Sequence, residues 1–325
     1  MVDVESGAGL RSEPTRLVLG TMPFGDTVPE VRARAIVEAA VAAGIEEIDT
    51  ANTYAGGAGE PIVGRVLAEG GEGVAVSSKV GMQPATAPDR GPLSSAAIVA
   101  SAEASVERVG RALDTLYLHQ PDRSTELEDT LTGVAEVLDR GLAARFGLSN
   151  YSAWEMVEIQ ALSARLGLPE PRRAQQLYSA LARRLELEFL PYAVDRDIET
   201  VVYNPLAGGL LTGRYRHDDE PESGRFGTSA LAAMYRKRYW NHAQFTALEE
   251  LRAIAAQAAV PMAELALRWL IGTPGVSAIL IGASTPEQLR ANIEALGRGG
   301  LDAEVRAAID AATGVLLSTS PQYAR

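Results

Sequence analysis

The chain has 325 residues and a formal net charge of −12 at pH 7, and this acidic balance argues against general affinity for nucleic acid or anionic membranes. It contains no cysteine, which excludes disulfides, thiolate catalysis and cysteine-based zinc sites. With 46% hydrophobic residues, no run long enough to span a membrane and no signal-peptide pattern, we expect a cytoplasmic protein with one large core.

Short β-type runs alternate with longer amphipathic segments along the chain. The expected strands are residues 16–20, 45–49, 74–79, 113–119, 143–149, 173–178, 198–204 and 276–282. Helical patterns lie between them, and three of these, 30–44, 94–110 and 127–141, end at a glycine. Eight strands that each precede a helix predict an α/β fold, the (β/α)8 TIM barrel. A doubly wound sheet is the alternative, but the first strand is not followed by its usual G-x-G-x-x-G loop.

Two segments depart from this regular alternation. Residues 205–245 follow the seventh strand and are too long for an ordinary connection, so they are a candidate cofactor or substrate loop. The C-terminal tail, "LLSTSPQYAR", follows the last helix and is expected to fold over the active site. No linker interrupts the pattern, so residues 1–325 are expected to form a single barrel domain.

Polar side chains stand where the expected strands end, which is where the chemistry of this architecture gathers. These positions hold Asp49, Tyr54, Lys79, His119, Ser149, Asn150, Gln175 and Tyr203, with "GAST" at 282–285. Lys79 is one of two lysines among 30 basic residues, which leaves 28 arginines, and lysine can lower its pKa where arginine cannot. Each residue alone has a structural explanation; Thr285 and Gln288, for example, form a capping-box pattern. Their position on one rim favours a functional explanation.

Four of these residues together suggest a pocket for a carbonyl group. The phenol of Tyr54 has an ordinary pKa near 10, and a Lys79 ammonium beside it is expected to lower that pKa. Asp49 would supply the counter-charge that a buried ammonium needs, and a neutral His119 could donate a hydrogen bond to the carbonyl oxygen. The set lacks a hydride source, so a nicotinamide must complete it.

The chain resembles the aldo-keto reductase superfamily in motifs that span nearly its whole length. They are "LGTMPFG" (19–25), "IDTANTYAGGAGE" (48–60), "VSSKVG" (76–81), "LDTLYLHQPD" (113–122), "ARFGLSNYSAWE" (144–155), "AQQLYS" (174–179), "VVYNPLAGGLLTGRY" (201–215) and "ILIGASTPEQLRAN" (279–292). The segment 224–240 and the "SPQYAR" ending are most similar to the branch that reduces aflatoxin dialdehyde and succinic semialdehyde. The resemblance implies NADPH-dependent reduction of an aldehyde or ketone to an alcohol.

The resemblance also implies a role for each matched residue. Tyr54 would be the general acid, tuned by Lys79 and Asp49, and His119 would orient the carbonyl. NADP(H) would be held by Thr21, Met22, Asp49, Ser149, Asn150, Gln175, Tyr203, Asn204, Pro205, Leu206, Gly208, Leu210, Arg214, Gly282, Ser284, Gln288 and Asn292. A small-molecule carbonyl substrate, either a carboxylate-bearing aldehyde or a natural-product or sugar ketone, would contact Tyr54, His119, Arg225 and Arg325.

The sequence departs from the family pattern at the cofactor phosphate. Many relatives place a Lys–Ser pair at the 2′-phosphate, whereas this chain has Gly282 and Ala283, so NADPH preference must rest on Ser284, Gln288, Arg214 or Arg290. In the "GRF" loop, Gly227 and Thr228 stand where the semialdehyde branch has Phe and Asn, which leaves the substrate open.

Two other functions stay open as alternatives. One is a non-catalytic or slow NADPH-sensing subunit of the same fold, and a less favoured one is a Schiff-base aldolase that uses Lys79. A metal site is not expected, because the three histidines show no ligand spacing. The resemblance is compatible with a homodimer or a higher homo-oligomer.

Overall fold

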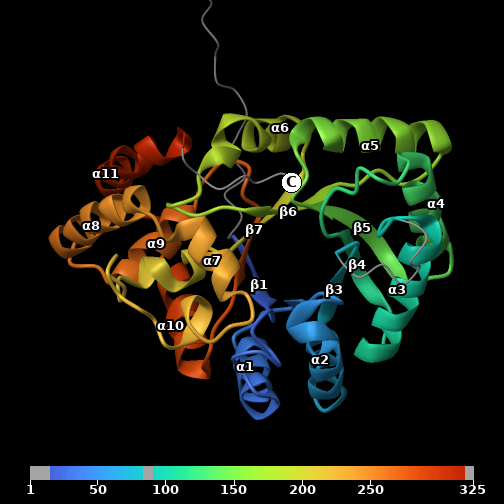
Figure 1. The fold of residues 1–325 in the computed structure, drawn as a ribbon, viewed down its shortest axis with the longest axis horizontal. Coiled ribbons are helices and arrows are strands. Elements are labelled where there is room, and N and C mark those ends of the chain that lie inside the picture. The colour runs from blue at the N-terminus through green and yellow to red at the C-terminus, as the bar shows by residue number, and fades with distance from the viewer. Residues whose placement is uncertain (1–14, 83–90, 319–325) are drawn as a thin grey trace, which may run out of the picture.

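Eight parallel strands form a closed barrel in this computed structural model, which describes residues 15–82 and 91–318. The strands are β1 (Arg16–Gly20), β2 (Glu47–Asp49), β3 (Ala75–Val80), β4 (Leu113–Leu118), β5 (Ala143–Ser149), β6 (Arg173–Leu177), β7 (Glu199–Tyr203) and β8 (Ala278–Ile281). Each pairs with its sequence neighbour, and β8 pairs with β1 to close the barrel (Figure 1). The predicted (β/α)8 barrel is confirmed, and the doubly wound alternative is wrong.

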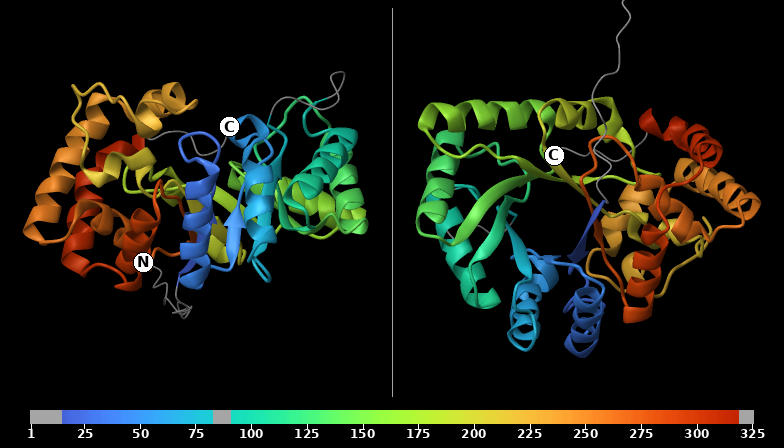
Figure 2. Two further views of the ribbon diagram at one scale, coloured as in Figure 1. Left: turned by 90° about the horizontal axis from the view of Figure 1, so that it is seen from below. Right: turned by 180° about the vertical axis from the view of Figure 1, so that it is seen from behind.

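The helices surround the strands on the outside (Figures 1 and 2). They are α1 (Glu30–Ala42), α2 (Gly59–Ala68), α3 (Ser95–Val109), α4 (Leu127–Asp139), α5 (Ala153–Leu166), α6 (Phe189–Asp195), α7 (Ala232–Tyr239), α8 (His242–Gln257), α9 (Met262–Leu270), α10 (Pro286–Gly297) and α11 (Ala303–Gly314). The expected glycine stop is seen at Gly110, which follows α3 with φ 78°. Within the described ranges, none of these helices combines the length and apolarity that a membrane span requires.

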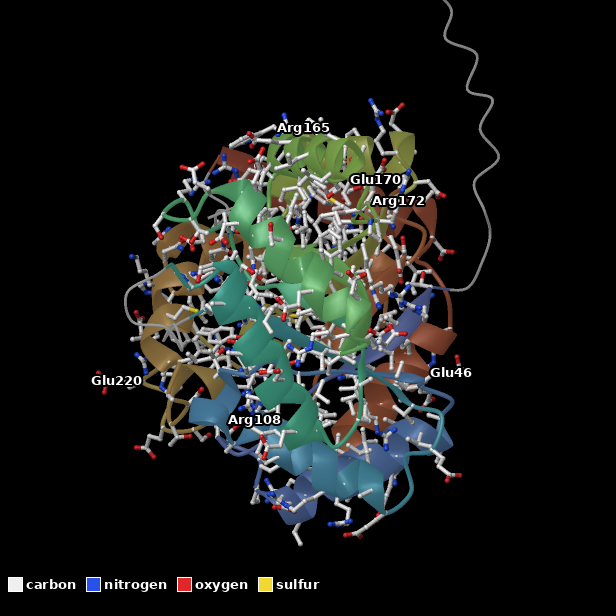
Figure 3. All side chains as sticks on the ribbon, turned by 90° about the vertical axis from the view of Figure 1, so that its right-hand side faces the viewer. Glu46, Arg108, Arg165, Glu170, Arg172 and Glu220 are labelled. Atoms are coloured by element: carbon white, nitrogen blue, oxygen red, sulfur yellow. The ribbon has the colours of Figure 1, made fainter. Side chains whose placement is uncertain are left out.

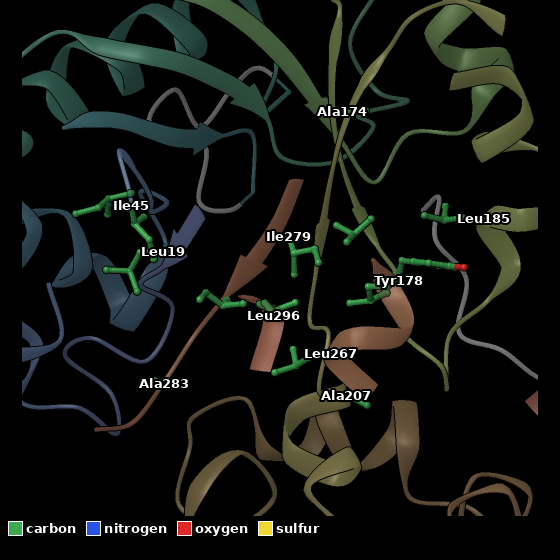
Figure 4. Packing of buried hydrophobic residues seen from close by; sticks show 14 of the residues in the cluster. Leu19, Ile45, Ala174, Tyr178, Leu185, Ala207, Leu267, Ile279, Ala283 and Leu296 are labelled. Carbon is green, nitrogen blue, oxygen red and sulfur yellow. The ribbon is translucent and has the colours of Figure 1, made fainter. Parts of the chain in front are cut away.

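The apolar core lies between the outer faces of the strands and the helices. Strand residues such as Leu19, Ala174 and Ile279 pack there against helix residues such as Leu267 and Leu296 (Figure 4). Fully burying one Leu or Ile side chain contributes about 1.5–3 kcal/mol, so this layer stabilises the barrel. Charged side chains stand on the outer surface, as Figure 3 shows for Arg165 of α5 and for Glu170 and Arg172.

The inside of the barrel, in contrast, is largely polar. Residues paired across parallel strands point to the same face, and the register pairs Asp49 with Ser77, Lys79 with Tyr117, and Tyr117 with Gly147. Asp49 and Lys79 are both buried inside the barrel. Alternation along the strands therefore sends apolar residues outward to the helices and polar residues inward.

Residues 205–245 form a compact segment with short helical turns between β7 and α8. It contains η3 (Ala207–Thr212), η4 (Gly224–Phe226) and α7, and its rings pack together, with Phe226 lying 5.1 Å from Trp240 between ring centroids. Ser229 Oγ donates to Asp26 Oδ2 at 2.6 Å, which ties the segment to the loop after β1. The predicted tail cannot be placed, because residues 319–325 lie outside the described ranges.

Candidate active site

Lys79 stands at the centre of a hydrogen-bonded cluster at the carboxyl ends of β2 and β3. Its Nζ donates to Thr50 O at 2.8 Å and to Tyr54 Oη at 3.0 Å, and it forms an ion pair with Asp49 Oδ1. Gln175 Nε2 donates to the other oxygen of Asp49 at 2.7 Å. The side chains of Lys79 and Asp49 are both 1% exposed. The ammonium thus has three acceptors and the carboxylate has donors on both oxygens, which is what a buried ion pair requires.

The glycine-rich loop after β2 turns Tyr54 back toward Lys79. This loop contains η1 (Tyr54–Gly57), in which Ala55, Gly56 and Gly57 have φ of 51°, 65° and 99°. Glycine adopts such left-handed conformations without strain, whereas Ala55 is held there by its surroundings. A Cβ at Gly59 would lie 3.1 Å from Cβ of Tyr54, so a side chain there would crowd the tyrosine.

The ionisation of the Lys79–Tyr54 pair corrects one expectation from the sequence. Burial acts to lower the pKa of Lys79, but the charges and hydrogen bonds of Asp49 and Tyr54 outweigh it, and the pKa is raised. The pKa of Tyr54 is also raised, because burial of the phenol outweighs the opposing effect of Lys79. The expected net lowering of the Tyr54 pKa is therefore wrong. Tyr54 keeps its proton at neutral pH, as an acid must, and the charged Lys79 is poorly suited to be an aldolase nucleophile.

His119 lies beside Tyr54 at the end of β4. The two rings meet edge to face, with their centroids 6.1 Å apart, and His119 is 8% exposed. Its backbone N–H donates to Val80 O at 2.8 Å, so its position is fixed by the neighbouring strand. The phenol, ammonium, carboxylate and imidazole named from the sequence therefore share one site.

Three predicted nicotinamide-binding residues form one network next to His119. Tyr203 Oη donates to Asn150 Oδ1 at 2.7 Å, and Asn150 Nδ2 donates to Ser149 Oγ at 3.0 Å and to His119 O at 2.9 Å. Asn150 adopts φ 63°, a left-handed conformation that asparagine tolerates better than most residues. These hydrogen bonds hold the carboxyl ends of β5 and β7 together beside His119.

Several predicted cofactor residues have their side chains engaged within the protein. Asn204 accepts from Gly208 N and donates to Tyr239 Oη, both at 2.7 Å, and so shapes the loop after β7. Thr21 and Leu210, whose contact with the cofactor stays a prediction, are both fully buried. Thr21 Oγ1 donates inward to Asp49 O at 2.8 Å, while Leu210 packs in the core.

The loop from β8 into α10 holds the predicted phosphate end of the site. Gln288 Oε1 accepts from Ser284 N at 3.0 Å, and Thr285 Oγ1 accepts from Gln288 N at 3.3 Å, so Gln288 takes part in capping α10. The amino terminus of a helix favours an anion. Of the other predicted cofactor residues, Asn292 lies in α10, and the rest lie on the loops that follow β1, β7 and β8: Met22, Pro205, Leu206, Arg214 and Gly282.

Sequence reasoning missed Arg238 of α7, which hydrogen-bonds Tyr239 and lies near Tyr203 and Tyr235. Among the residues that the structure describes, Arg238 has no carboxylate within ion-pair distance, and Nη1 of Arg225 is buried without a hydrogen-bond partner. The Arg225 guanidinium carbon lies 5.4 Å from the Tyr235 ring centroid. The sequence did offer one signal for Arg238: it stands three residues after Tyr235, a spacing that puts the two side chains on one face of a helix.

Both arginines therefore suit an anionic ligand. Arg325, the other predicted substrate residue, lies outside the described ranges. In residues 15–82 and 91–318 no cluster of three or more His, Cys, Asp or Glu residues is arranged to hold a metal ion.

The chain is similar to known proteins over most of its length. Residues 16–313 match the model of the Aldo/keto reductase family. The rat protein named aflatoxin B1 aldehyde reductase member 2 is 34% identical over 98% of this chain and 89% of its own length. The human protein named aldo-keto reductase family 7 member A3 is 34% identical, over 95% and 96% respectively. A thale cress (Arabidopsis thaliana) protein named probable voltage-gated potassium channel subunit beta is 32% identical, over 84% of each chain.

Proposed function

The chain belongs to the aldo/keto reductase family and is an NAD(P)-dependent oxidoreductase, and on this premise we propose that it reduces an aldehyde or ketone with Tyr54 as general acid. One observation carries the proposal: the Tyr54 hydroxyl lies 3.0 Å from a buried Lys79 ammonium, and His119 lines the same mouth. A proton donor and an orienting group are thereby held where a carbonyl oxygen can reach both.

The residues of the chain can carry the proton half of the reaction. When bound, NAD(P)H supplies the hydride. As the carbonyl oxygen gains negative charge, Tyr54 donates its proton to that oxygen, and the Lys79 ammonium stabilises the phenolate that remains. Asp49 keeps the ammonium charged and aimed at Tyr54. His119 donates a hydrogen bond to the same oxygen and fixes the carbonyl.

Two neighbouring guanidinium groups in the segment 205–245 favour NADPH over NADH. Arg225 has a buried nitrogen without a partner within the described residues, and Arg214 Nη2 would lie 3.2 Å from a Cβ at Gly224, beside Arg225 in the chain. In a chain with net charge −12, such a local cationic pair indicates a bound anion. The 2′-phosphate is the anion that distinguishes the two cofactors.

The substrate that this mouth suits best carries a carboxylate. Arg238 lies beside Tyr203 and Tyr235, and in the described part of the chain no acidic residue neutralises it. A carboxylate pairs with a guanidinium in a charge-assisted, bidentate arrangement. Replacing Arg238 with leucine should raise KM for carboxylate-bearing aldehydes about tenfold or more and leave KM for neutral aldehydes nearly unchanged. The exposed neighbour Lys237→Leu is the matched control, and equal effects of both changes would contradict the assignment.

The acid role is tested with Tyr54→Phe in a steady-state assay of NADPH consumption. Loss of a general acid should lower kcat about 10²- to 10⁴-fold, while NADPH binding, measured by fluorescence, persists. Tyr192→Phe removes a hydroxyl that bonds Gln160 far from the site and should keep full activity. Near wild-type turnover by Tyr54→Phe would overturn the role of this residue.

A non-catalytic or slow NADPH-sensing subunit is the second candidate, because relatives named as potassium channel β-subunits match most of the chain. Both candidates predict NADPH binding. Only the reductase should turn over at least one aldehyde at about 1 s⁻¹ or faster, which is the lower range for enzymes. A panel of charged and neutral aldehydes distinguishes the two, since uniformly slow turnover would favour the sensing role.

A further inference from the structure

A second buried ion pair lies inside the barrel, between Glu47 of β2, the strand that also carries Asp49, and Arg173 of β6. Arg173 Nη2 is 2.6 Å from Glu47 Oε2, and the two side chains are 2% and 6% exposed. Ser77 Oγ donates to Glu47 Oε1 at 2.6 Å, and Arg173 Nη1 donates to Thr115 Oγ1 at 3.0 Å. Arg173 Nε makes no hydrogen bond among the described residues but lies 3.5 Å from Glu199 Oε2, and Arg16 Nη2 lies 3.4 Å from Glu47 Oε2. Such a pair is costly to bury, and nothing in the proton transfer described above uses it.

This lower pair lies directly beneath the Lys79–Asp49 pair. Glu47 and Asp49 are two residues apart on β2 and point to the same face, which puts their backbones about 7 Å apart. The like charge of Glu47 is felt at Asp49, where it adds to the effect of burial in raising the pKa of the carboxyl. The two ion pairs are therefore consecutive layers of one buried charge system.

Tyr117 is a third buried side chain inside the barrel, near both ion pairs. It is fully buried, is register-paired with Lys79, and has its ring centroid 5.7 Å from the Arg173 guanidinium carbon. A Cβ at Gly147 would lie 2.7 Å from Cε1 of Tyr117 and 3.0 Å from O of Arg173. Glycine at position 147 therefore leaves room for this ring beside Arg173.

At the opposite end of the barrel, where the strands begin, four charged side chains add no net charge beneath the two ion pairs. Arg16 and Arg145 carry two positive charges there, and Asp114 and Glu199 carry two negative ones, with exposed fractions from 28% to 45%. Arg145 pairs with Asp114 at 2.8 Å, and Arg16 pairs with Glu199. Because these groups balance one another and are partly solvated, the charge nearest to Asp49 from below is set by the Glu47–Arg173 pair.

We infer that Glu47 and Arg173 are positioning residues of the reaction centre, which act by holding the charge beneath Asp49 at zero. This inference rests on the proposed function, because it assigns their role to the proton donor Tyr54. The ionisable groups that face this centre are Asp49, Tyr54, Lys79, His119, Tyr203 and Tyr235 around it, and Glu47, Tyr117, Arg173 and Glu199 below it.

Opposite single-charge changes provide the test, because the role requires effects of opposite sign. Glu47→Gln removes one negative charge from beneath Asp49 and should lower the pKa of Tyr54, whereas Arg173→Gln removes one positive charge and should raise it. A unit charge about 10 Å away at an effective dielectric constant of about 20 gives a shift on the order of one pH unit. The double variant should return the pKa of Tyr54 to the wild-type value, and the conservative Arg173→Lys should leave it near that value.

The pKa of Tyr54 is read from phenolate absorbance between about pH 8 and 12. Each variant is compared with the same variant carrying Tyr54→Phe, and circular dichroism confirms that the chain stays folded. This readout works even if the protein reduces no carbonyl, so failure of the proposed function would be seen separately as an inactive wild type. In an active protein, the alkaline limb of kcat/KM should move with the titration.

The inference would be overturned if the two single variants shifted the pKa of Tyr54 in the same direction or not at all. A double variant whose Tyr54 pKa differs from the wild-type value would also overturn it. Should a glutamine variant unfold before Tyr54 titrates, the Arg173→Lys variant and the double variant still decide. In both variants the pKa of Tyr54 must match the wild-type value. A shifted titration of Tyr54, or a shifted alkaline limb of kcat/KM, in either variant would contradict the role.

Discussion

Replacing Lys79 with methionine should destabilise the protein as well as inactivate it. Methionine keeps most of the length of the side chain but removes the cation, so Asp49 stays buried with Gln175 as its only remaining side-chain donor among the contacts described above. Both side chains of the pair are 1% exposed, and breaking a pair this deeply buried costs about 3–5 kcal/mol. That is a large part of the total of about 5–15 kcal/mol that stabilises a typical protein.

The loss of stability in the Lys79→Met variant should be larger at neutral pH than at acidic pH. In the variant, the unpaired buried Asp49 has a folded-state pKa raised above its unfolded value of about 3.9. Folding then favours the protonated form, so the stability present near pH 4 is lost as the pH rises through the folded-state pKa. Urea unfolding followed by circular dichroism should therefore show a larger deficit at pH 7 than at pH 4.

Two further variants show whether the unpaired charge is the cause. The Lys79→Met, Asp49→Asn double variant removes both charges and should recover most of the lost stability while it remains inactive. Lys237→Met, on the surface of α7, should leave the stability of the protein within about 0.5 kcal/mol of wild type. A deficit below about 1 kcal/mol in Lys79→Met, or a double variant no more stable than the single one, would refute the reasoning.

Two other predictions follow from the geometry. A Cβ at Gly64 would lie 2.4 Å from O of Arg108, so Gly64→Ala should cost about 1–3 kcal/mol in thermal unfolding, whereas Gly70→Ala, with open space around it, should be nearly neutral. Because the pKa of Tyr54 is raised above its ordinary value, kcat/KM for reduction should stay flat from neutral pH to about pH 10 and fall only above it. A pH–rate profile that falls by half below pH 8 would contradict this.

The sequence by itself determined the barrel and the polar side chains that meet at the carboxyl ends of its strands. Alternating strand and helix patterns predict parallel strands, and parallel strands bring their carboxyl ends to one edge. Residues far apart in the chain, such as Asp49, Lys79 and His119, could therefore be assigned to one site from their positions alone. The cap of α10 by Thr285, which accepts from Gln288 N, was readable because it depends only on local spacing.

Only the tertiary structure decided what depends on burial and on contacts across the barrel. Glu47 and Arg173 are 126 residues apart, and no local pattern indicates that they pair. The net direction of the Tyr54 pKa is a balance between Lys79 and desolvation, and desolvation is known only once the surrounding atoms are placed. Spacing along a chain indicates which edge a residue reaches, whereas its charge state and its partners depend on everything that packs around it.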